Sequence, residues 1–178
     1  ENYMNLGDNF VQEGLANRIT PFTTKNPGVK NFDTEKAYRN VMFRYKYGGL
    51  RKPGLYIDET VMRMCYTHRN LFAQLALQLI AEHKLDKAKK VLDKEEKELP
   101  EYNIPHKFDS GSMDLARAYA VLGEKAKAKH IVDILWKNAS QYWNWYLSLD
   151  GSNFQGSMND CIKQMYIMQQ LNQITRLF

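Results

Sequence analysis

The chain has 178 residues, a length typical of one domain or of one domain with an appendage. Hydrophobic residues make up 44% of it and charged residues 25%, which excludes a disordered chain, a collagen and a disulfide-rich miniprotein. The net charge of +5 is uneven, because the stretch from Lys36 to Arg69 holds eight Lys or Arg against two acidic residues.

No segment of the chain is predicted to cross a membrane. The longest nearly apolar run, Leu71 to Ala81, is far shorter than the roughly 20 residues that a spanning helix needs. The chain begins at Glu1 without a leader pattern, which is typical of a fragment or a processed product. Cys65 and Cys161 permit one disulfide but do not require it.

Residues 1–32 are predicted to form an irregular lead-in that packs on the main body. Its apolar pattern is interrupted by Gly7, Gly14, Pro21, Pro27 and Gly28. This composition leaves room for a short helix at most and for an extended piece near Arg18 to Phe22.

Two helices are predicted next, and each has an aspartate as its N-cap. Asp33 caps a helix from Thr34 to Tyr47, which Gly48 and Gly49 bring to an end. Asp58 then caps a long helix from Glu59 to Glu82. Helical pattern continues after this helix almost without a break.

Two segments of the chain match at an offset of 40 residues. The residues expected to pack the two copies are Phe72, Leu75, Ala76, Leu79, Ala88, Leu92 and Pro100 in the first, and Leu115, Ala116, Tyr119, Gly123, Ala128 and Val132 in the second. Small members let two antiparallel helices approach closely, and large members fill the grooves between neighbouring hairpins.

This pattern resembles the tetratricopeptide repeat, in which a Leu-small pair, a large or aromatic residue, a small Ala and a closing Pro recur. The resemblance implies an all-α superhelix with helical hairpins at about residues 69–102 and 109–142. The match is imperfect, because the connection from Glu101 to Gly111 lengthens the period. Ser112 replaces the large residue that opens a repeat, and Ser140 replaces the second closing Pro.

Two repeats leave apolar faces at both ends of the stack, so capping helices are expected. The helix from Thr34 to Tyr47 is the predicted cap at one end, and a helix over about residues 157–176 at the other. The second cap carries a stripe of Cys161, Met165, Met168 and Leu171. Residues 33–178 are therefore predicted to form one tetratricopeptide-like domain.

The common catalytic and phosphate-binding motifs are absent, and neither an enzyme activity nor a cofactor is predicted. Cys65 and His68 have metal-ligand spacing, but two ligands are half of a zinc site, and no metal ion is predicted. His83, His106 and His130 are interpreted as surface or capping residues.

The run from Lys84 to Glu101 holds six Lys and six Asp or Glu. Its four-residue pairs are Asp86 with Lys90, Asp93 with Lys97, and Lys94 with Glu98, so the run is predicted to be a solvated helix face.

A second charged set is called the basic face and consists of Arg39, Arg44, Lys46, Arg51 and Lys52. Three interpretations stay open for it: a solvated cap surface, a surface that contacts an anionic membrane or a partner, and a nucleic-acid site.

Four rings form what is called the aromatic cluster, namely Tyr142, Trp143, Trp145 and Tyr146. Such rings either line a ligand groove for sugars and peptides or pack between helices. Packing is the expected role of some of them, because consecutive rings point in different directions.

The whole chain also resembles one family over most of its length and in order. The segments that carry the likeness are residues 3–21, Asp33–Lys36, Tyr47–Leu50, Tyr56–Glu59, Arg69–Ala76 and the repeat pair. They are similar to the soluble C-terminal region of a bacterial membrane-protein family of unknown function related to protein O-mannosyltransferases. The resemblance implies an extramembrane domain of an inner-membrane protein, facing the periplasm, with any catalytic residues in the membrane part.

Two functions from different classes follow as expectations. The first is a non-catalytic scaffold domain whose concave helical face holds a protein or peptide, or docks on the parent's own membrane part. The second is a glycan- or lipid-linked-sugar-binding accessory domain that uses the aromatic cluster as its platform.

Overall fold

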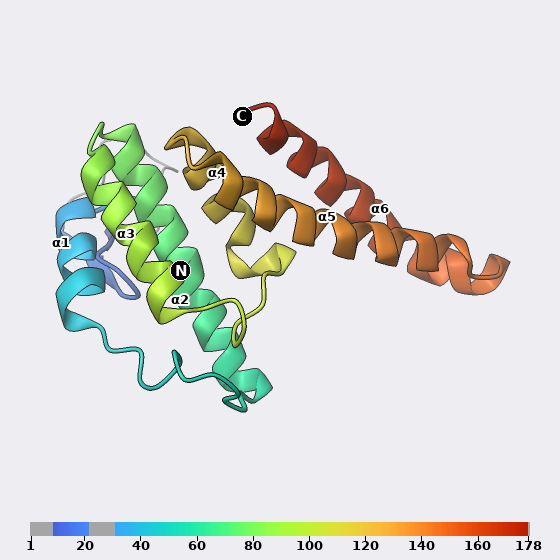
Figure 1. Cartoon of the computed structure of the whole chain (residues 1–178), viewed down its shortest axis with the longest axis horizontal. Helices are drawn as coiled ribbons and strands as arrows, with labels where there is room; N and C mark the ends of the chain where they lie inside the picture. Colours follow the sequence, from blue (N-terminus) through green and yellow to red (C-terminus); the bar gives the residue numbers. More distant parts are fainter. Residues whose placement is uncertain (1–8, 22–30, 178) are drawn as a thin grey trace.

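The computed structural model describes residues 9–21 and 31–177. Helices make up most of this part of the chain, and one small sheet lies near the N-terminus (Figure 1). The all-α fold class predicted from the sequence is confirmed.

The described part of the lead-in forms a sheet of three short strands. They are β1 (Phe10–Gln12), β2 (Asn17–Ile19) and β3 (Asn31–Phe32), in the order β2-β1-β3. Strand β1 runs antiparallel to β2 and parallel to β3. The extended piece expected near Arg18 is β2, whereas the sheet itself was not predicted. Phe22, the end of the expected piece, lies outside the described residues.

The first helix begins where the sequence predicts and ends earlier. The Asp33 carboxylate accepts a hydrogen bond from the Lys36 backbone N–H (3.0 Å), and α1 (Thr34–Arg39) continues as the π-helix η3 (Asn40–Arg44). The backbone is extended at Tyr45, which places the rings of Tyr45 and Tyr47 both against His68. In a helix these two rings would point to different sides. The expected end at Tyr47 is therefore wrong, because packing on α2 overrides helix propensity.

Two helical hairpins follow, α2 (Glu59–Ala81) with α3 (Leu85–Glu98) and α4 (Ser112–Val121) with α5 (Lys125–Leu147). Their turns have equivalent hydrogen bonds at the 40-residue offset. Lys84 N–H donates to the Leu79 carbonyl (2.8 Å), and Glu124 N–H donates to the Tyr119 carbonyl (3.0 Å). His83 and Gly123, one at each turn, both have a positive φ, of 60° and 80°. The internal match thus extends to backbone geometry.

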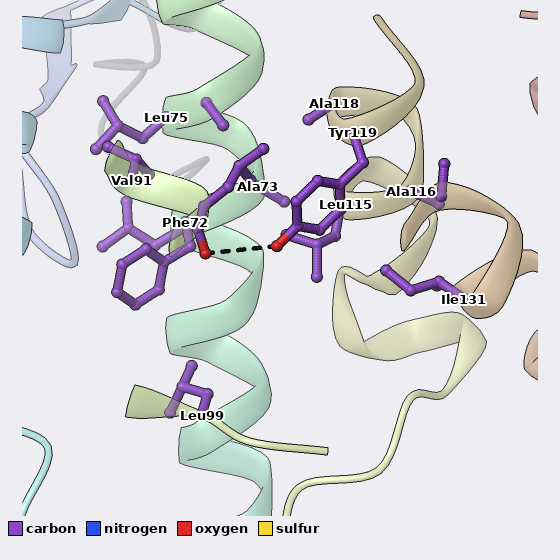
Figure 2. Close-up of a cluster of buried hydrophobic side chains, with 14 of the residues drawn as sticks. Phe72, Ala73, Leu75, Val91, Leu99, Leu115, Ala116, Ala118, Tyr119 and Ile131 are labelled. Atoms are coloured by element: carbon purple, nitrogen blue, oxygen red, sulfur yellow. Dashed lines mark hydrogen bonds between the residues drawn. The ribbon is translucent and has the colours of Figure 1, made fainter. Parts of the chain in front are cut away.

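The core lies where α2 contacts α3 and α4, and where α4 contacts α5 (Figure 2). All the residues expected to pack the two copies are buried except Gly123, which is exposed and serves the turn instead. The Tyr119 hydroxyl donates a hydrogen bond to the Leu92 carbonyl (3.5 Å), which joins the second hairpin to the first (Figure 2).

Helix α6 (Gly151–Thr175) lies beside α5, and the pair projects from the rest of the molecule (Figure 1). It begins earlier than predicted because Asp150 acts as its N-cap, accepting from the Asn153 N–H (3.2 Å). Its buried side chains are Cys161, Gln164, Ile167, Leu171 and Ile174. Met165, assigned to the buried stripe from the sequence, is exposed on the other side of the helix.

Candidate binding groove

Three members of the aromatic cluster lie on one face of α5 near its C-terminal end. Tyr142, Trp145 and Tyr146 are three and four residues apart and therefore share a helix face, whereas Trp143 lies on another side. Tyr142 is 55% exposed and Trp145 54% exposed. The structure therefore separates Trp143 from the other three, and it leaves two of the rings largely open to solvent.

The three rings support one another. The centroids of Trp145 and Tyr146 are 4.9 Å apart with the rings tilted by 58°, and Tyr142 stacks on Tyr146 at 6.5 Å. Burial raises the pKa of Tyr146, and the nearby Asp160 carboxylate adds to this rise. The contacts hold the rings in a row without covering their outer faces.

These rings form one wall of a groove of about 790 Å³. The remaining lining residues are Leu135, Asn138, Ala139 and Gln141 on α5, Asp160, Lys163, Gln164 and Ile167 on α6, and Lys107, Phe108 and Asp109 at the 3-10 helix η4 (Phe108–Ser110). The Lys163 ammonium lies over the Phe108 ring at 6.0 Å. The groove thus combines apolar rings with amide and charged groups of both signs, and it can take a ligand that is partly apolar and rich in hydrogen-bonding groups.

A second hollow of about 270 Å³ lies between α2, α4 and α6. Asn70, Met113, Arg117 and Tyr166 line it together with Phe108 and Asp109, which also line the groove. The two hollows therefore adjoin at η4. A third hollow, of about 490 Å³, lies between the hairpins on the side of α3 and α5. None of the described lead-in residues lines any of the three.

A buried arginine positions the connection that carries η4. The Arg69 guanidinium is fully buried and donates to the Glu95 carboxylate (2.8 Å) and to the carbonyls of Leu99 (3.1 Å), Ile104 (2.7 Å) and Pro105 (3.1 Å). Burial raises the pKa of Glu95, and the guanidinium opposes that rise. The residues before η4 are thus fixed against α2.

Sequence reasoning missed this pair, since Arg69 was counted in the basic stretch and Glu95 in a solvated helix face. The spacing of these two residues from neighbouring apolar residues does indicate that they are buried. Arg69 follows Cys65 by four residues and precedes Phe72 by three, and Glu95 lies midway between Val91 and Leu99. Both residues therefore occupy positions in buried helical stripes.

His106 is buried as well, so its interpretation as a surface or capping residue is wrong. Its Nδ1 lies 2.8 Å from the Ser112 hydroxyl, which lies 2.8 Å from the Ser110 hydroxyl. Burial lowers the pKa of His106 to about 4, and the positive charge of Arg69 adds to the effect. His106 is therefore neutral near pH 7 and acts as part of the core.

Helix α4 approaches α2 very closely at its start. A Cβ added to Gly111 would lie 2.8 Å from the Cα of Asn70. Ser112, the next residue, is fully buried. The close approach at Gly111 and the burial of Ser112 favour small residues at both positions.

The charged run on α3 connects helices and is not a purely solvated face. None of the three expected four-residue pairs is among the ion pairs of the described residues. Instead Lys84 and Lys87 bind Glu35 on α1 (2.7 and 2.9 Å), and Lys89 binds Glu124 at the second turn (2.8 Å). Hydrogen bonds from the two lysines lower the pKa of Glu35 to about 2.

All five residues of the basic face are exposed. Within the described part of the chain only Arg51 among them forms an ion pair, with Glu98 at 3.4 Å.

Cys65 and Cys161 are buried free thiols that do not pair with each other. Burial raises the pKa of Cys65 and lowers the pKa of His68. Residues 9–21 and 31–177 contain no group of three or more His, Cys, Asp or Glu placed to hold a metal ion. In the same residues, no helix is both long enough and apolar enough to span a bilayer.

Comparisons with known proteins find no family model, no curated protein and no solved structure that matches this chain.

Proposed function

We propose that this chain is a non-catalytic binding domain that holds a protein or peptide segment in the groove between α5 and α6. The observation that carries the proposal is the exposure of Tyr142 and Trp145 above an open groove. Exposed rings grouped beside a hollow are typical of contact surfaces, in which aromatic residues supply much of the binding energy.

An extended segment fits the arrangement better than a compact ligand does. The groove and the hollow between α2, α4 and α6 share Phe108 and Asp109, so one chain can pass from the first to the second. Arg117 and Asp114, paired at 2.9 Å, stand in the second hollow and offer both charges to such a chain.

The domain is further proposed to consist of two divergent tetratricopeptide-like repeats with capping helices. The equivalent hydrogen bonds and positive φ angles at the two turns support this assignment. The sequence resemblance described above supports its placement as the extramembrane C-terminal part of a glycosyltransferase-like bacterial membrane protein, on the periplasmic side. The parent's membrane part is then a second protein surface that this domain can contact.

A glycan is the second candidate ligand, and the composition of the groove favours it. Tyr142, Trp145 and Tyr146 line the groove together with Asp160, Lys163 and Gln164 on α6 and with Asn138 and Gln141 on α5. Rings stack on sugar faces, while amide and charged groups bind hydroxyls.

The test selects peptides from a random library on the purified domain and measures their affinity by calorimetry. We expect the double variant W145A/Y146A to weaken the selected peptides by about 30-fold, as for a binding hot spot. The matched control W143F, on another side of α5, should leave the affinity unchanged.

An oligosaccharide panel is measured on the same three proteins. If the library yields no peptide, and W145A/Y146A abolishes the binding of a sugar, the ligand is a glycan and not a peptide. Ligands of either class that bind W145A/Y146A as well as the wild type would contradict both.

A further inference from the structure

The segment from Arg39 to Ile57 has an unusual charge pattern. It contains all five cations of the basic face and no acidic residue, and Asp58 is the first carboxylate after it. The run from Lys84 to Glu101, in contrast, balances its lysines with an equal number of acids. Positive charge is therefore concentrated on this segment.

The fold pairs one of these five cations, Arg51, with Glu98 (3.4 Å), and the other four form no ion pair with a described residue. Arg39, Lys46 and Lys52 are exposed and form no ion pair with any described residue, and Arg44 only contacts the Asn40 side-chain oxygen (3.3 Å). On α3 and α1, by comparison, Glu35 joins Lys84 and Lys87 and fastens the two helices. The basic face is thus free to bind an anionic surface.

Exposed apolar side chains accompany the basic face. Phe43 is 75% exposed and Tyr56 89% exposed, and Leu55 lies between the loop cations and Tyr56. Val61 and Met64, in the first turns of α2, are also exposed. Figure 1 shows the segment between η3 and α2 as an irregular trace along one edge of the molecule. The cations and the exposed apolar side chains therefore belong to one continuous stretch of the chain, residues 39–64, whose irregular part runs along this edge.

We propose that this edge docks on an anionic phospholipid bilayer. The cations of the basic face bind lipid headgroups, and Phe43, Leu55 and Tyr56 insert at headgroup depth. Basic residues near an anionic leaflet and amphipathic rings at the interface are the two terms that hold peripheral proteins on membranes. Because the C-terminal part of α5, which carries the aromatic cluster, projects away from the segment that leads into α2 (Figure 1), docking leaves the groove open to its ligand. The inference is independent of the proposed function.

A lipid surface explains the apolar side chains better than a nucleic acid does. Single-stranded nucleic acids need a row of rings on which successive bases stack. Leu55, Val61 and Met64 cannot provide stacking, whereas aliphatic side chains gain free energy at the boundary of the acyl chains.

The test is co-sedimentation of the purified chain with phosphatidylcholine vesicles prepared with and without phosphatidylglycerol. We expect binding only to the anionic vesicles, and binding that weakens as ionic strength rises. The triple variant R44E/K46E/K52E should lower the partition coefficient at least about 100-fold, at about fivefold per cation. The double variant F43S/Y56S should lower it about tenfold in a way that added salt does not change.

The control is the triple variant K90E/K97E/K129E on another surface, which changes the net charge by the same amount at exposed positions of α3 and α5. It should retain binding within about threefold. Circular dichroism on each variant verifies folding. Equal losses in both triple variants, or binding to vesicles without anionic lipid, would overturn the proposal. Displacement from the vesicles by a single-stranded oligonucleotide at equal phosphate concentration would also overturn it, in favour of a nucleic-acid site.

Discussion

The first and second hairpins have equivalent turns, but the side chains at two equivalent positions differ in charge and in burial. In the first, Arg69 and Glu95 form a fully buried ion pair. Forty residues later the corresponding positions are the exposed Asp109 and the buried Leu135. The first hairpin therefore contains a buried ion pair, whereas the positions 40 residues later, one in η4 and one on α5, line the groove without a charge pair.

The hairpins also differ in the length of their second helix. Pro100 follows the end of α3, because proline cannot donate a helical hydrogen bond and restricts the residue before it. Ser140 stands at the equivalent position of α5, and the helix continues to Leu147. This extension carries the aromatic cluster and one side of the groove. The part of α5 beyond Ser140 thus supplies the rings that line the groove.

Removing the buried Arg69 cation is expected to change the free energy of unfolding more than any other substitution considered below. R69M leaves Glu95 unpaired and three carbonyls without a donor, so it should lower the free energy of unfolding by about 3–5 kcal/mol in urea titrations. The change at the position 40 residues later, D109A in η4, should cost less than about 0.5 kcal/mol. The double variant R69M/E95L should be more stable than R69M, because no unpaired charge stays buried. A loss below about 1 kcal/mol for R69M would contradict the account.

A proline at position 140, where the first hairpin has Pro100, should end α5 early. S140P removes a helical hydrogen bond and clashes with the preceding turn, for a loss of about 3 kcal/mol or more and a fall in helical circular dichroism. S140A tests the contact of the Ser140 hydroxyl with the Met168 sulfur and should cost less than about 0.5 kcal/mol. Full helicity and stability in S140P would show that the missing proline does not set the length of α5.

Alanine substitutions at two glycines with the same backbone conformation distinguish steric crowding by a neighbouring helix from backbone strain. Gly111 and Gly123 have φ of 78° and 80°, but only Gly111 would place a Cβ against the backbone of Asn70. G111A should therefore lower the free energy of unfolding by about 3 kcal/mol, from strain and overpacking together. G123A carries only the strain, about 1 kcal/mol. If thermal unfolding shows equal losses of stability in G111A and G123A, the close approach of α4 to α2 at Gly111 is contradicted.

Acid should destabilise the connection between the hairpins through His106. Its pKa is about 4 in the folded chain, below the ordinary value near 6.5, so the unfolded chain binds the proton first as the pH falls. Stability is complete above about pH 6.5 and declines towards pH 4, by on the order of 2 kcal/mol at pH 4.5. H106N, which keeps a hydrogen-bonding group near Ser112, should flatten this part of the profile. An unchanged slope between pH 6.5 and 4.5 would contradict the buried neutral histidine.

The smallest expected effect is an increase in the free energy of unfolding. His83 has the positive φ that Gly123 has in the second turn, and a histidine is strained there. H83G should raise the free energy of unfolding by about 0.5–1 kcal/mol, measured by urea titration. H83A keeps the strain and serves as the control. A loss of stability in H83G would break the equivalence of the two turns.

The helices were predictable because local signals set their boundaries. Asp33 and Asp58 cap the helices that the sequence assigns to them, and the buried residues of both hairpins follow helical spacing. The early end of the first helix was not predictable from local pattern, because it depends on Tyr45 and Tyr47 packing on a helix far along the chain.

The site was less predictable than the fold. The clustering of rings was visible in the sequence, but the exposure of Tyr142 and Trp145 depends on how α6 lies beside α5. Arg69 and Glu95 have the composition of surface residues, and only their place in apolar stripes indicated burial. Partners that lie 26 residues apart in sequence become a pair only once the hairpin has closed.

The most direct measurement of the central claim uses Trp145 as a reporter. The chain contains three tryptophans, so W136F/W143F leaves Trp145 as the single tryptophan. The library-selected peptide is titrated into this variant, and the tryptophan emission is followed beside calorimetry on the same variant. We predict a saturable change in Trp145 emission with the dissociation constant found by calorimetry. A silent Trp145 under conditions where calorimetry shows binding would contradict the groove between α5 and α6 as the binding site.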